Sequence, residues 1–424
     1  MVRGLERVFG HAELEVVGDG GRVGVRFRVT HGARLIESRM CGRGVGDVPY
    51  IASRICGACS IAHCLASVRA LEDALGLKVD EGVETLRDVI NAIQVAQNHV
   101  MHLALLALPD YGYAKGLRPS PLVKRALRIN AACLTAINIL AGRIVNPTTI
   151  AIGGLRRRVS RDSLLKAADA LSSVAGDAEK LLAEVASIDV PRLKEPPSYC
   201  LSIRPSCGYL THGSEIIAFS KVFGSIGFSV KLYGDHLERE VVPYSNSKHI
   251  TVDGRPAFTG PRARVTIHRD SILGRLGRAA ELLEGADLSN PFTNLLAEAA
   301  EVLYVLRWAP ETLRCLNVPA GPAEVRERFS IYDDVVAGAA CVEAPRGVLI
   351  HRYVVSGGRV VEADIITPTQ INAKHIEVCG EALAREALAS GTGLEGLEAV
   401  EEALVRSYDP CLPCAVHVIR LGGV

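Results

Sequence analysis

Alternating hydrophobic and polar positions open the chain. Residues 12–17 and 22–29 each alternate with a period of two, and the glycine-rich residues 18–21 separate them. Successive side chains of a strand point to opposite faces of a sheet, so this alternation predicts two strands joined as a β-hairpin. A second hairpin is predicted within residues 348–366, where Ser356-Gly357-Gly358 provides the turn.

A helical spacing of apolar residues follows the first of two cysteine pairs. Leu65, Val68, Leu71 and Leu75 recur every three or four residues, and Gly76 follows as a stop signal. Comparable patterns predict further helices over residues 84–108, 121–144, 162–188, 271–284, 294–308 and 373–388. Helices therefore make up most of the predicted structure.

The order of these elements predicts one globular domain over residues 1–424, because the chain has no internal repeat and no low-complexity linker. The expected fold class is α+β, predominantly helical, with an N-terminal β region. Within the domain we expect mainly β structure over 1–53, helices over 54–190, irregular and β structure over 196–265, helices over 270–310, and mixed α/β structure over 335–424.

Composition narrows the classes of function. The 424 residues are 48% hydrophobic, which is enough for a large core. The formal net charge is +1 and aromatic residues make up 5%, so we expect neither a nucleic-acid partner nor an anionic membrane surface as a partner. No apolar run is long enough to span a bilayer, and the first residues lack the apolar stretch of a secretory signal. We therefore expect a cytoplasmic protein.

Two C-x-x-C pairs, Cys56/Cys59 and Cys411/Cys414, lie near opposite ends of the chain. A tight turn brings both sulfurs of such a pair to one side, where they can bind one soft metal ion. A structural metal clip usually takes its ligands from a short local stretch, so this separation favours a chemical role. The other eight cysteines are expected to be buried small hydrophobes: Cys41, Cys64, Cys133, Cys200, Cys207, Cys315, Cys341 and Cys379.

Taken alone, two such pairs are typical of structural zinc. Leu412 and Pro413 fill the second pair, whereas zinc knuckles favour glycine and polar residues, and an apolar helix follows the first pair. His63 and His417 follow their pairs closely enough to donate to a sulfur or to bind a second ion. These details, together with a nearby arginine, favour a buried redox centre, and a zinc-stabilised interaction module remains an alternative.

The motifs around the cysteines match a known family. The chain resembles the large, catalytic subunit of nickel–iron hydrogenases. The family motif R-x-C-G-x-C-x-x-x-H is matched by Arg54, Cys56, Gly57, Cys59 and His63, and D-P-C-x-x-C-x-x-H by Asp409, Pro410, Cys411, Cys414 and His417. Residues 343–351 look like the family's P-R-G-x-L-x-H element. The resemblance implies the hydrogenase large-subunit fold, with a metal site that joins the two chain ends, and is nearest to members that reduce soluble cofactors.

The resemblance also implies the metals and their ligands. Nickel would be bound by all four cysteines, with Cys56 and Cys411 as terminal ligands. Cys59 and Cys414 would bridge the nickel to an iron that carries carbonyl and cyanide ligands. A magnesium ion would be bound by Glu37, the carbonyl of Ile365 and His417, a set of hard donors typical of that ion.

Further residues receive roles from the same resemblance. Arg346, flanked by Pro345, would place its guanidinium over the open face of the metals, and Asp409 would orient Arg346 or a neighbouring backbone group. His63 would donate to a bridging sulfur, and Thr369 would donate a hydrogen bond to a cyanide in the pocket that Pro345 helps to form.

Two departures from the family pattern concern protons and charge. Where the family commonly has a glutamate that relays protons, in an R-x-E-G-H element, this chain has Phe9. Phenylalanine cannot carry a proton, so Glu6, Glu13 or ordered water would substitute, or turnover would be slow. Asn98 takes the place of an aspartate that many members have, and members that reduce soluble cofactors also lack that aspartate.

The implied activity is the reversible heterolytic oxidation of dihydrogen to protons and electrons. No further C-x-x-C run is present to hold iron–sulfur clusters, so an iron–sulfur small subunit is the implied partner, with further electron-transfer subunits beyond it. Such subunits would also provide any association with a membrane. Maturation proteins are implied as partners, because the family usually loses a C-terminal peptide after the position of His417. The alternative is a hydrogen-sensing or weakly active paralogue that binds the same metals.

Overall fold

The computed structural model describes residues 2–19, 22–32, 35–113, 120–318, 334–390 and 394–416. The α-helices are α1 (Ile36–Met40), α2 (Val48–Ala52), α3 (Ser60–Ala74), α4 (Glu81–Met101), α5 (Pro121–Ala141), α6 (Arg161–Ser172), α7 (Ala175–Ala186), α8 (Tyr233–His236), α9 (Pro261–Ile267), α10 (Arg269–Leu276), α11 (Ala280–Glu284), α12 (Asn294–Cys315), α13 (Pro368–Ser390), α14 (Leu394–Ser407) and α15 (Leu412–Ala415). Shorter turns are the π-helical η1 (His102–Ala107) and the 3-10 turns η2 (Leu108–Tyr111), η3 (Val230–Leu232), η4 (Gly277–Ala279) and η5 (Pro291–Thr293).

The strands are short and belong to several separate sheets. They are β1 (Val2–Gly4), β2 (Ala12–Asp19), β3 (Arg22–Val29), β4 (Ile150–Ala151), β5 (Gly154–Leu155), β6 (Tyr199–Ile203), β7 (Glu215–Ser220), β8 (Gly224–Ser229), β9 (Leu237–Glu240), β10 (His249–Val252), β11 (Ala257–Thr259), β12 (Val336–Ala344), β13 (Gly347–Ser356) and β14 (Arg359–Ile366). The sheet orders are β1-β2-β3, β4-β5, β11-β6-β7-β8, β10-β9 and β12-β13-β14. All neighbours pair antiparallel except β11 and β6, which are parallel.

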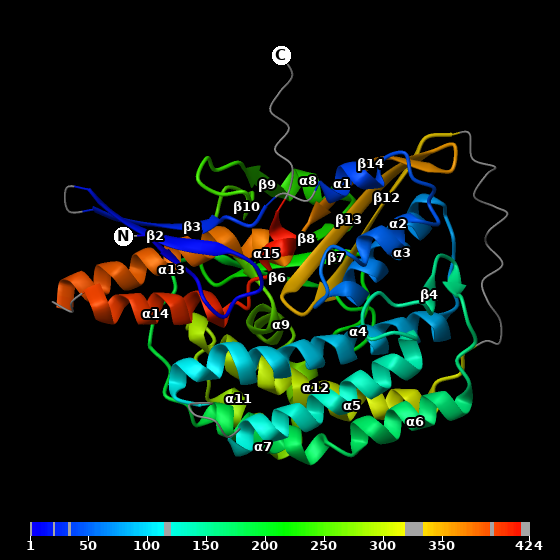
Figure 1. Cartoon of the computed structure of the whole chain (residues 1–424), viewed down its shortest axis with the longest axis horizontal. Coiled ribbons are helices and arrows are strands. Elements are labelled where there is room, and N and C mark those ends of the chain that lie inside the picture. Colours follow the sequence, from blue (N-terminus) through cyan, green and yellow to red (C-terminus); the bar gives the residue numbers. More distant parts are fainter. Residues whose placement is uncertain are drawn as a thin grey trace.

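A layer of long helices forms one side of the molecule. Helices α4, α5, α6, α7 and α12 pack side by side below the sheets in Figure 1. Their ends are encoded locally: Asp80 accepts hydrogen bonds from the first backbone amides of α4, and Ser120 does the same for α5. Because α4 packs against α12 along its length, polar side chains on their facing surfaces can meet in the interior.

The β12-β13-β14 sheet lies above the helical layer. Helix α3 packs against β12 and β13, while α13 packs against β3, β10 and β11 at the other end of the molecule (Figure 1). The β12–β13 turn is tight, because Gly347 has φ +125 and a Cβ there would lie 2.4 Å from Thr259. This turn carries the preceding residue, Arg346, into the buried centre of the molecule.

Both predicted hairpins are confirmed, as β2–β3 and β13–β14. The expectation for residues 1–53 was only partly right, because α1 and α2 follow the N-terminal strands. The helix predicted over 162–188 is broken between α6 and α7, and the one over 271–284 is divided by η4. Two helices are longer than expected: α12 continues through Pro310 to Cys315, and α13 begins at Pro368.

In the part of the chain that the structure describes, no helix combines the length and apolar character needed to cross a bilayer. The expectation about the isolated cysteines was wrong at three positions, since Cys41, Cys207 and Cys315 are exposed while the other five are buried.

Candidate metal centre

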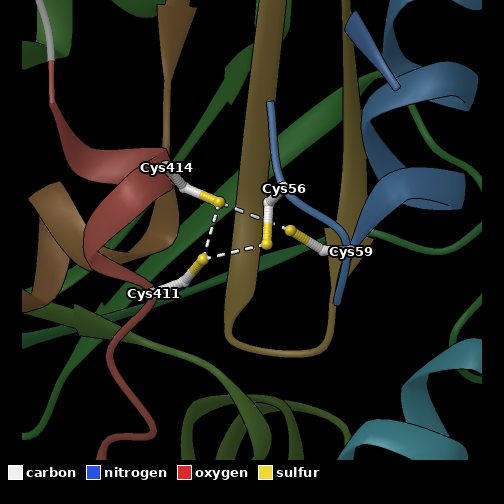
Figure 2. Close-up of side chains that lie close together, drawn as sticks. All are labelled: Cys56, Cys59, Cys411 and Cys414. Atoms are coloured by element: carbon white, nitrogen blue, oxygen red, sulfur yellow. Dashed lines mark hydrogen bonds between the residues drawn. The ribbon is translucent and has the colours of Figure 1, made fainter. Parts of the chain in front are cut away.

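The two cysteine pairs meet in the interior. Figure 2 shows the four sulfurs pointing toward one another, two from the segment before α3 and two from around α15. The Sγ–Sγ distances are 3.2 Å for Cys56–Cys411, 3.4 Å for Cys59–Cys414 and 2.8 Å for Cys411–Cys414. All four sulfurs lie within 4.8 Å of one another. Within the described ranges, this is the one group of three or more Cys, His, Asp or Glu residues arranged to bind a metal ion.

Side chains from α4 hold the first pair in place. Gln94 Oε1 accepts the backbone amides of Ile61 and Ala62 at 3.0 and 3.3 Å, so it caps the start of α3 directly after Cys59. Asn98 Nδ2 donates to the carbonyl oxygen of Ala58, which lies between the two cysteines, at 2.7 Å. The loop of the first pair is therefore fixed by a helix that follows it in the chain.

The second pair is fixed by its own turn and by α13. The amide of Cys414 donates to the carbonyl of Cys411 at 3.1 Å, which closes the C-x-x-C turn. The amide of Cys411 donates to Oγ1 of Thr369, in the first turn of α13, at 3.0 Å. Since Thr369 Oγ1 accepts this bond, its hydroxyl proton can be donated to a group beside the sulfurs.

The four thiols compete for protons. Hydrogen bonds from Cys411, Cys414 and Cys59 lower the pKa of Cys56 well below its ordinary value. The hydrogen bond with Cys411 raises the pKa of Cys59, and burial raises the pKa of Cys414. The cluster thus favours a thiolate at Cys56 and protonated thiols at Cys59 and Cys414. A soft cation that displaces these protons would satisfy all four sulfurs at once.

Arg346 lies beside the sulfurs and is 4% exposed. Its Nε donates to the carbonyl of Asp409 at 2.6 Å, and Nη1 donates to Oδ1 of Asn98 at 3.3 Å. Nη2 lies 2.8 Å from Oδ2 of Asp409, without the alignment of a hydrogen bond. Burial opposes the charge, but Asp409 and the cysteine sulfurs outweigh it and raise the pKa of Arg346. The guanidinium is therefore a fixed positive charge at the site.

Asp409 has a left-handed backbone, with φ +48. This conformation costs a residue with a side chain about 1 kcal/mol, although aspartate tolerates it better than most. It lets Asp409 offer both its carbonyl and its carboxylate to Arg346. The expected contact between Asp409 and Arg346 is thus present.

The ring of Phe9 also contacts the guanidinium of Arg346. Its ring centre is 5.0 Å from the guanidinium carbon, which is a cation–π contact, and the residue is 37% exposed. Its carbonyl accepts the amide of Leu412 at 3.0 Å. The next residue, Gly10, has φ +103, and a Cβ there would lie 2.9 Å from Leu412 Cβ. The N-terminal segment therefore packs closely on the second cysteine pair.

A small cavity adjoins the sulfurs. Its lining consists of Cys59, His63, Ala344, Pro345, Arg346, Leu349, Pro368, Thr369, Cys411 and Cys414. Apolar walls with a few polar groups exclude water, and four sulfurs are the donors that nickel and iron favour. The residues present therefore fit the nickel–iron group with diatomic ligands that the motifs imply.

His63 lies in that lining and continues into a buried hydrogen-bonded chain. Its Nδ1 is 3.1 Å from Nε2 of His351, whose Nδ1 is 2.7 Å from the hydroxyl of Tyr353. Tyr353 in turn donates to Oγ of Ser67 at 3.1 Å. His351 comes from β13 and Ser67 from α3, so this chain connects the β12–β13 hairpin to the helix after the first cysteine pair.

Two of the three expected magnesium ligands lie together. Oε1 of Glu37, on α1, accepts the backbone amide of Ile365 at 3.0 Å, next to the carbonyl expected to bind the ion. His417, the third expected ligand, lies outside the described residues.

The arginine of the first motif is not at the metal site. Arg54 is exposed, and its Nη1 donates to the carbonyl of Tyr50 at 2.6 Å. The arginine that does face the sulfurs is Arg346.

A buried charged network behind Arg346 was not predicted from the sequence. Arg264 binds Glu301 through two nitrogens at 2.7 Å, Glu343 at 2.8 Å, and the carbonyls of Ala344 and Pro345. It therefore holds the backbone that presents Arg346. Burial opposes ionisation of Glu301, but Arg264 outweighs it and lowers the pKa of Glu301 to about 2.

The network had one recognisable signal. His99, on α4, and His102, the first residue of η1, lie three residues apart, as Glu298 and Glu301 do on α12, inside otherwise apolar stretches. His99 Nε2 lies 2.8 Å from Glu301 Oε2, and His102 Nδ1 lies 2.7 Å from Glu298 Oε2. Two matched pairs at helical spacing mark two helix faces that contact each other.

Comparison with known proteins gives consistent matches over nearly the whole chain. The family model described as nickel-dependent hydrogenase matches residues 34–112 and 233–417. Sulfhydrogenase 2 subunit alpha of Pyrococcus furiosus is 32% identical over 427 residues, covering 98% of each chain. Coenzyme F420 hydrogenase subunit alpha of Methanosarcina barkeri is 26% identical, covering 97% of this chain and 94% of its own. The structure of an NAD+-reducing [NiFe]-hydrogenase in the H2-reduced state superposes with a TM-score of 0.80, at 21% identity and 98% coverage of both chains.

Proposed function

The chain belongs to the nickel-dependent hydrogenase family as a large, catalytic subunit, and from this premise we propose how its own residues divide the work of oxidising dihydrogen. The observation that carries the proposal is the convergence of four buried cysteine sulfurs from the two ends of the chain. Cys56 and Cys411 would be terminal ligands of nickel. Cys59 and Cys414 would bridge nickel to an iron with carbonyl and cyanide ligands.

When bound, the metals would supply the centre at which dihydrogen is split heterolytically. Arg346 provides a positive charge next to that centre, and its three contacts restrict its position, so no reorganisation is needed during the reaction. Asp409 orients Arg346. The apolar lining, to which Pro345 and Leu349 contribute, keeps bulk water away from the bound gas.

Thr369 and His63 act on the ligands of the metals. The hydroxyl of Thr369 would donate to a cyanide, since its oxygen already accepts the amide of Cys411. His63 would donate to a bridging sulfur and stabilise its negative charge, while His351 holds the other edge of the imidazole. The magnesium site would combine Glu37, the carbonyl of Ile365 and His417.

The electrons would leave to an iron–sulfur partner subunit. Among the residues that the structure describes, no second cysteine-rich cluster is present to hold such a centre. Several relatives are themselves designated subunit alpha, which fits a multisubunit enzyme. We place the protein in the cytoplasm, with further electron-transfer subunits able to bring it to a membrane. Maturation proteins would insert the metals and act on the segment that follows His417.

Infrared spectroscopy of protein produced with its maturation machinery tests this proposal. The expected spectrum has bands of iron-bound carbonyl and cyanide, with nickel and iron detected by elemental analysis. Absence of these bands in metal-loaded protein would contradict the proposed centre.

Dye-linked dihydrogen uptake by the same preparation separates an enzyme from a sensor. Multiple turnovers are expected for the enzyme. Bands without turnover would instead favour the hydrogen-sensing paralogue, for which Phe9 at the usual position of a proton-relaying glutamate is the supporting observation.

A further inference from the structure

Each of three consecutive residues, two at the end of α14 and one directly after it, is held by a different buried element. His102, the first residue of η1 directly after α4, donates from Nε2 to the carbonyl of Arg406 at 2.8 Å. Asn294, at the start of α12, donates to the carbonyl of Ser407 at 2.7 Å. The hydroxyl of Tyr408 lies 2.6 Å from Nδ1 of His375, on α13.

The side chains that make these three contacts are themselves held in place by carboxylates. Glu298 accepts hydrogen bonds from both His102 and Asn294, with distances of 2.7 and 3.2 Å, so one carboxylate holds two of them. His375 is 0% exposed, and its Nε2 lies 3.5 Å from Oε2 of Glu195. Burial and the neighbouring Arg262 lower the pKa of His375, so its neutral imidazole accepts the Tyr408 proton at Nδ1.

The residue after this anchored segment is Asp409. Its amide donates to the same carbonyl of Arg406 that accepts from His102, at 2.9 Å. The backbone then turns left-handed, and the carbonyl of Asp409 accepts from Arg346 at 2.6 Å. An unfavourable backbone conformation persists only where its surroundings restrict it. Here these restrictions act directly on residues 406–408.

We propose that His102, Asn294 and His375 are positioning residues for Arg346. They hold the end of α14 so that Asp409 keeps its left-handed conformation and aims the guanidinium at the cysteine cluster. The effect of these residues on catalysis rests on the proposed function. The contacts that link them to Asp409 and Arg346 do not, because they are present without any metal. The alternative is that the three contacts merely stabilise the end of a helix.

Two substitutions that remove a hydrogen bond, and one that should restore it, test this proposal. Tyr408→Phe removes only the hydroxyl, and His102→Leu removes the donor to Arg406, whereas His102→Gln can keep an amide donor near the position of Nε2. We expect Tyr408→Phe and His102→Leu to lower kcat about tenfold, with KM for the dye unchanged and nickel retained. The infrared band of the iron-bound carbonyl should shift in both variants. His102→Gln should return the band position and kcat to those of the unsubstituted protein. Tyr304→Phe, on α12, is the matched control and should leave both unchanged.

A lower unfolding temperature with unchanged band and kcat would identify a merely structural role and overturn the proposal. If His102→Leu fails to fold, Tyr408→Phe decides the question alone. A crystal structure of metal-free Tyr408→Phe gives a reading that needs no cofactor: we expect the Arg346 guanidinium to be displaced. An unmoved guanidinium would overturn the positioning role, whereas missing infrared bands in the unsubstituted protein would count against the proposed function.

Discussion

Arg346 is covered by the ring of Phe9, with 5.0 Å between the guanidinium carbon and the ring centre. Within the described ranges, Asp409 is the one carboxylate in contact with this guanidinium, which the resemblance places at the reacting centre. The amide of Asn98 and the ring of Phe9 occupy two other sides. This arrangement holds the charge firmly, but Phe9 contributes no group that can take up a proton.

Replacing Phe9 by glutamate is expected to raise dihydrogen uptake several-fold, because a carboxylate at this half-exposed position could exchange protons with solvent. The measurement is dye-linked uptake between pH 6 and 9. Phe9→Gln, which has the same side-chain length without a titratable group, is the control. Equal rates in both variants would mean that protons leave by another route.

Replacing Cys59 by serine is expected to abolish nickel and iron binding, because a hard hydroxyl cannot replace a bridging thiolate. Elemental analysis after maturation measures the metal content. Cys64→Ala, on α3 just after Cys59, is a matched control, since Cys64 is a buried free thiol outside the cluster. Full metal content in Cys59→Ser would contradict the assigned ligand set.

Replacing Arg346 by lysine is expected to lower kcat/KM about 100-fold, because an ammonium cannot reproduce the planar contacts to Asp409 and Asn98. Metal content and infrared bands should remain. Arg352→Lys, on the strand β13 that follows Arg346 but paired with Glu362 at the surface, should retain full activity. A comparable loss in both variants would argue against a specific role of Arg346.

Replacing Arg264 by methionine is expected to lower the free energy of unfolding by about 3 to 5 kcal/mol, since Glu301 and Glu343 would lose their buried partner. Chemical denaturation with circular dichroism measures this change. The exposed Arg385, which pairs with Glu381, provides the comparison: Arg385→Ala should change stability by less than about 1 kcal/mol. Similar midpoints for both variants would disprove the importance of the network.

Glu401 makes stability depend on pH. Burial, followed by the nearby Glu398, raises its pKa from 4.5 to about 7. The folded state therefore binds more protons than the unfolded state between these values, and this residue's contribution to stability falls as pH rises through that window. Glu401→Gln should raise the melting temperature at pH 8 and have little effect at pH 5. An equal effect at both values would contradict the raised pKa.

The cysteine motifs and the regular elements could be predicted because their signals are local. The apolar spacing from Leu65 to Leu75 located α3, and alternation located β2 and β3. The contacts that support the site could not be predicted in this way, because they join buried charged residues that are distant in the sequence. Arg264 and Glu301 are buried at 1% and 0%, yet charged residues within helices usually mark a solvated face.

The two motif arginines differ in how far local sequence locates them. Arg54 lies two residues before a cysteine of the cluster, yet it is exposed and donates to the carbonyl of Tyr50. Arg346, which the resemblance places beside the metals, reaches the site from a hairpin that is distant in the sequence. The pairing of β12 with β13 brings Arg346 to the site, and a single sequence contains little information about such long-range pairing.

The separation of the paired cysteines also has a consequence for synthesis. Cys56 and Cys411 are 355 residues apart, so a ribosome adding about 5 to 20 residues per second makes the second pair roughly 20 to 70 seconds after the first. Throughout that interval Cys56 and Cys59 are a two-sulfur chelate, open to whichever soft metal the cell offers. The complete set of four sulfurs that could select one metal ion over another exists only after Cys411 and Cys414 have been made.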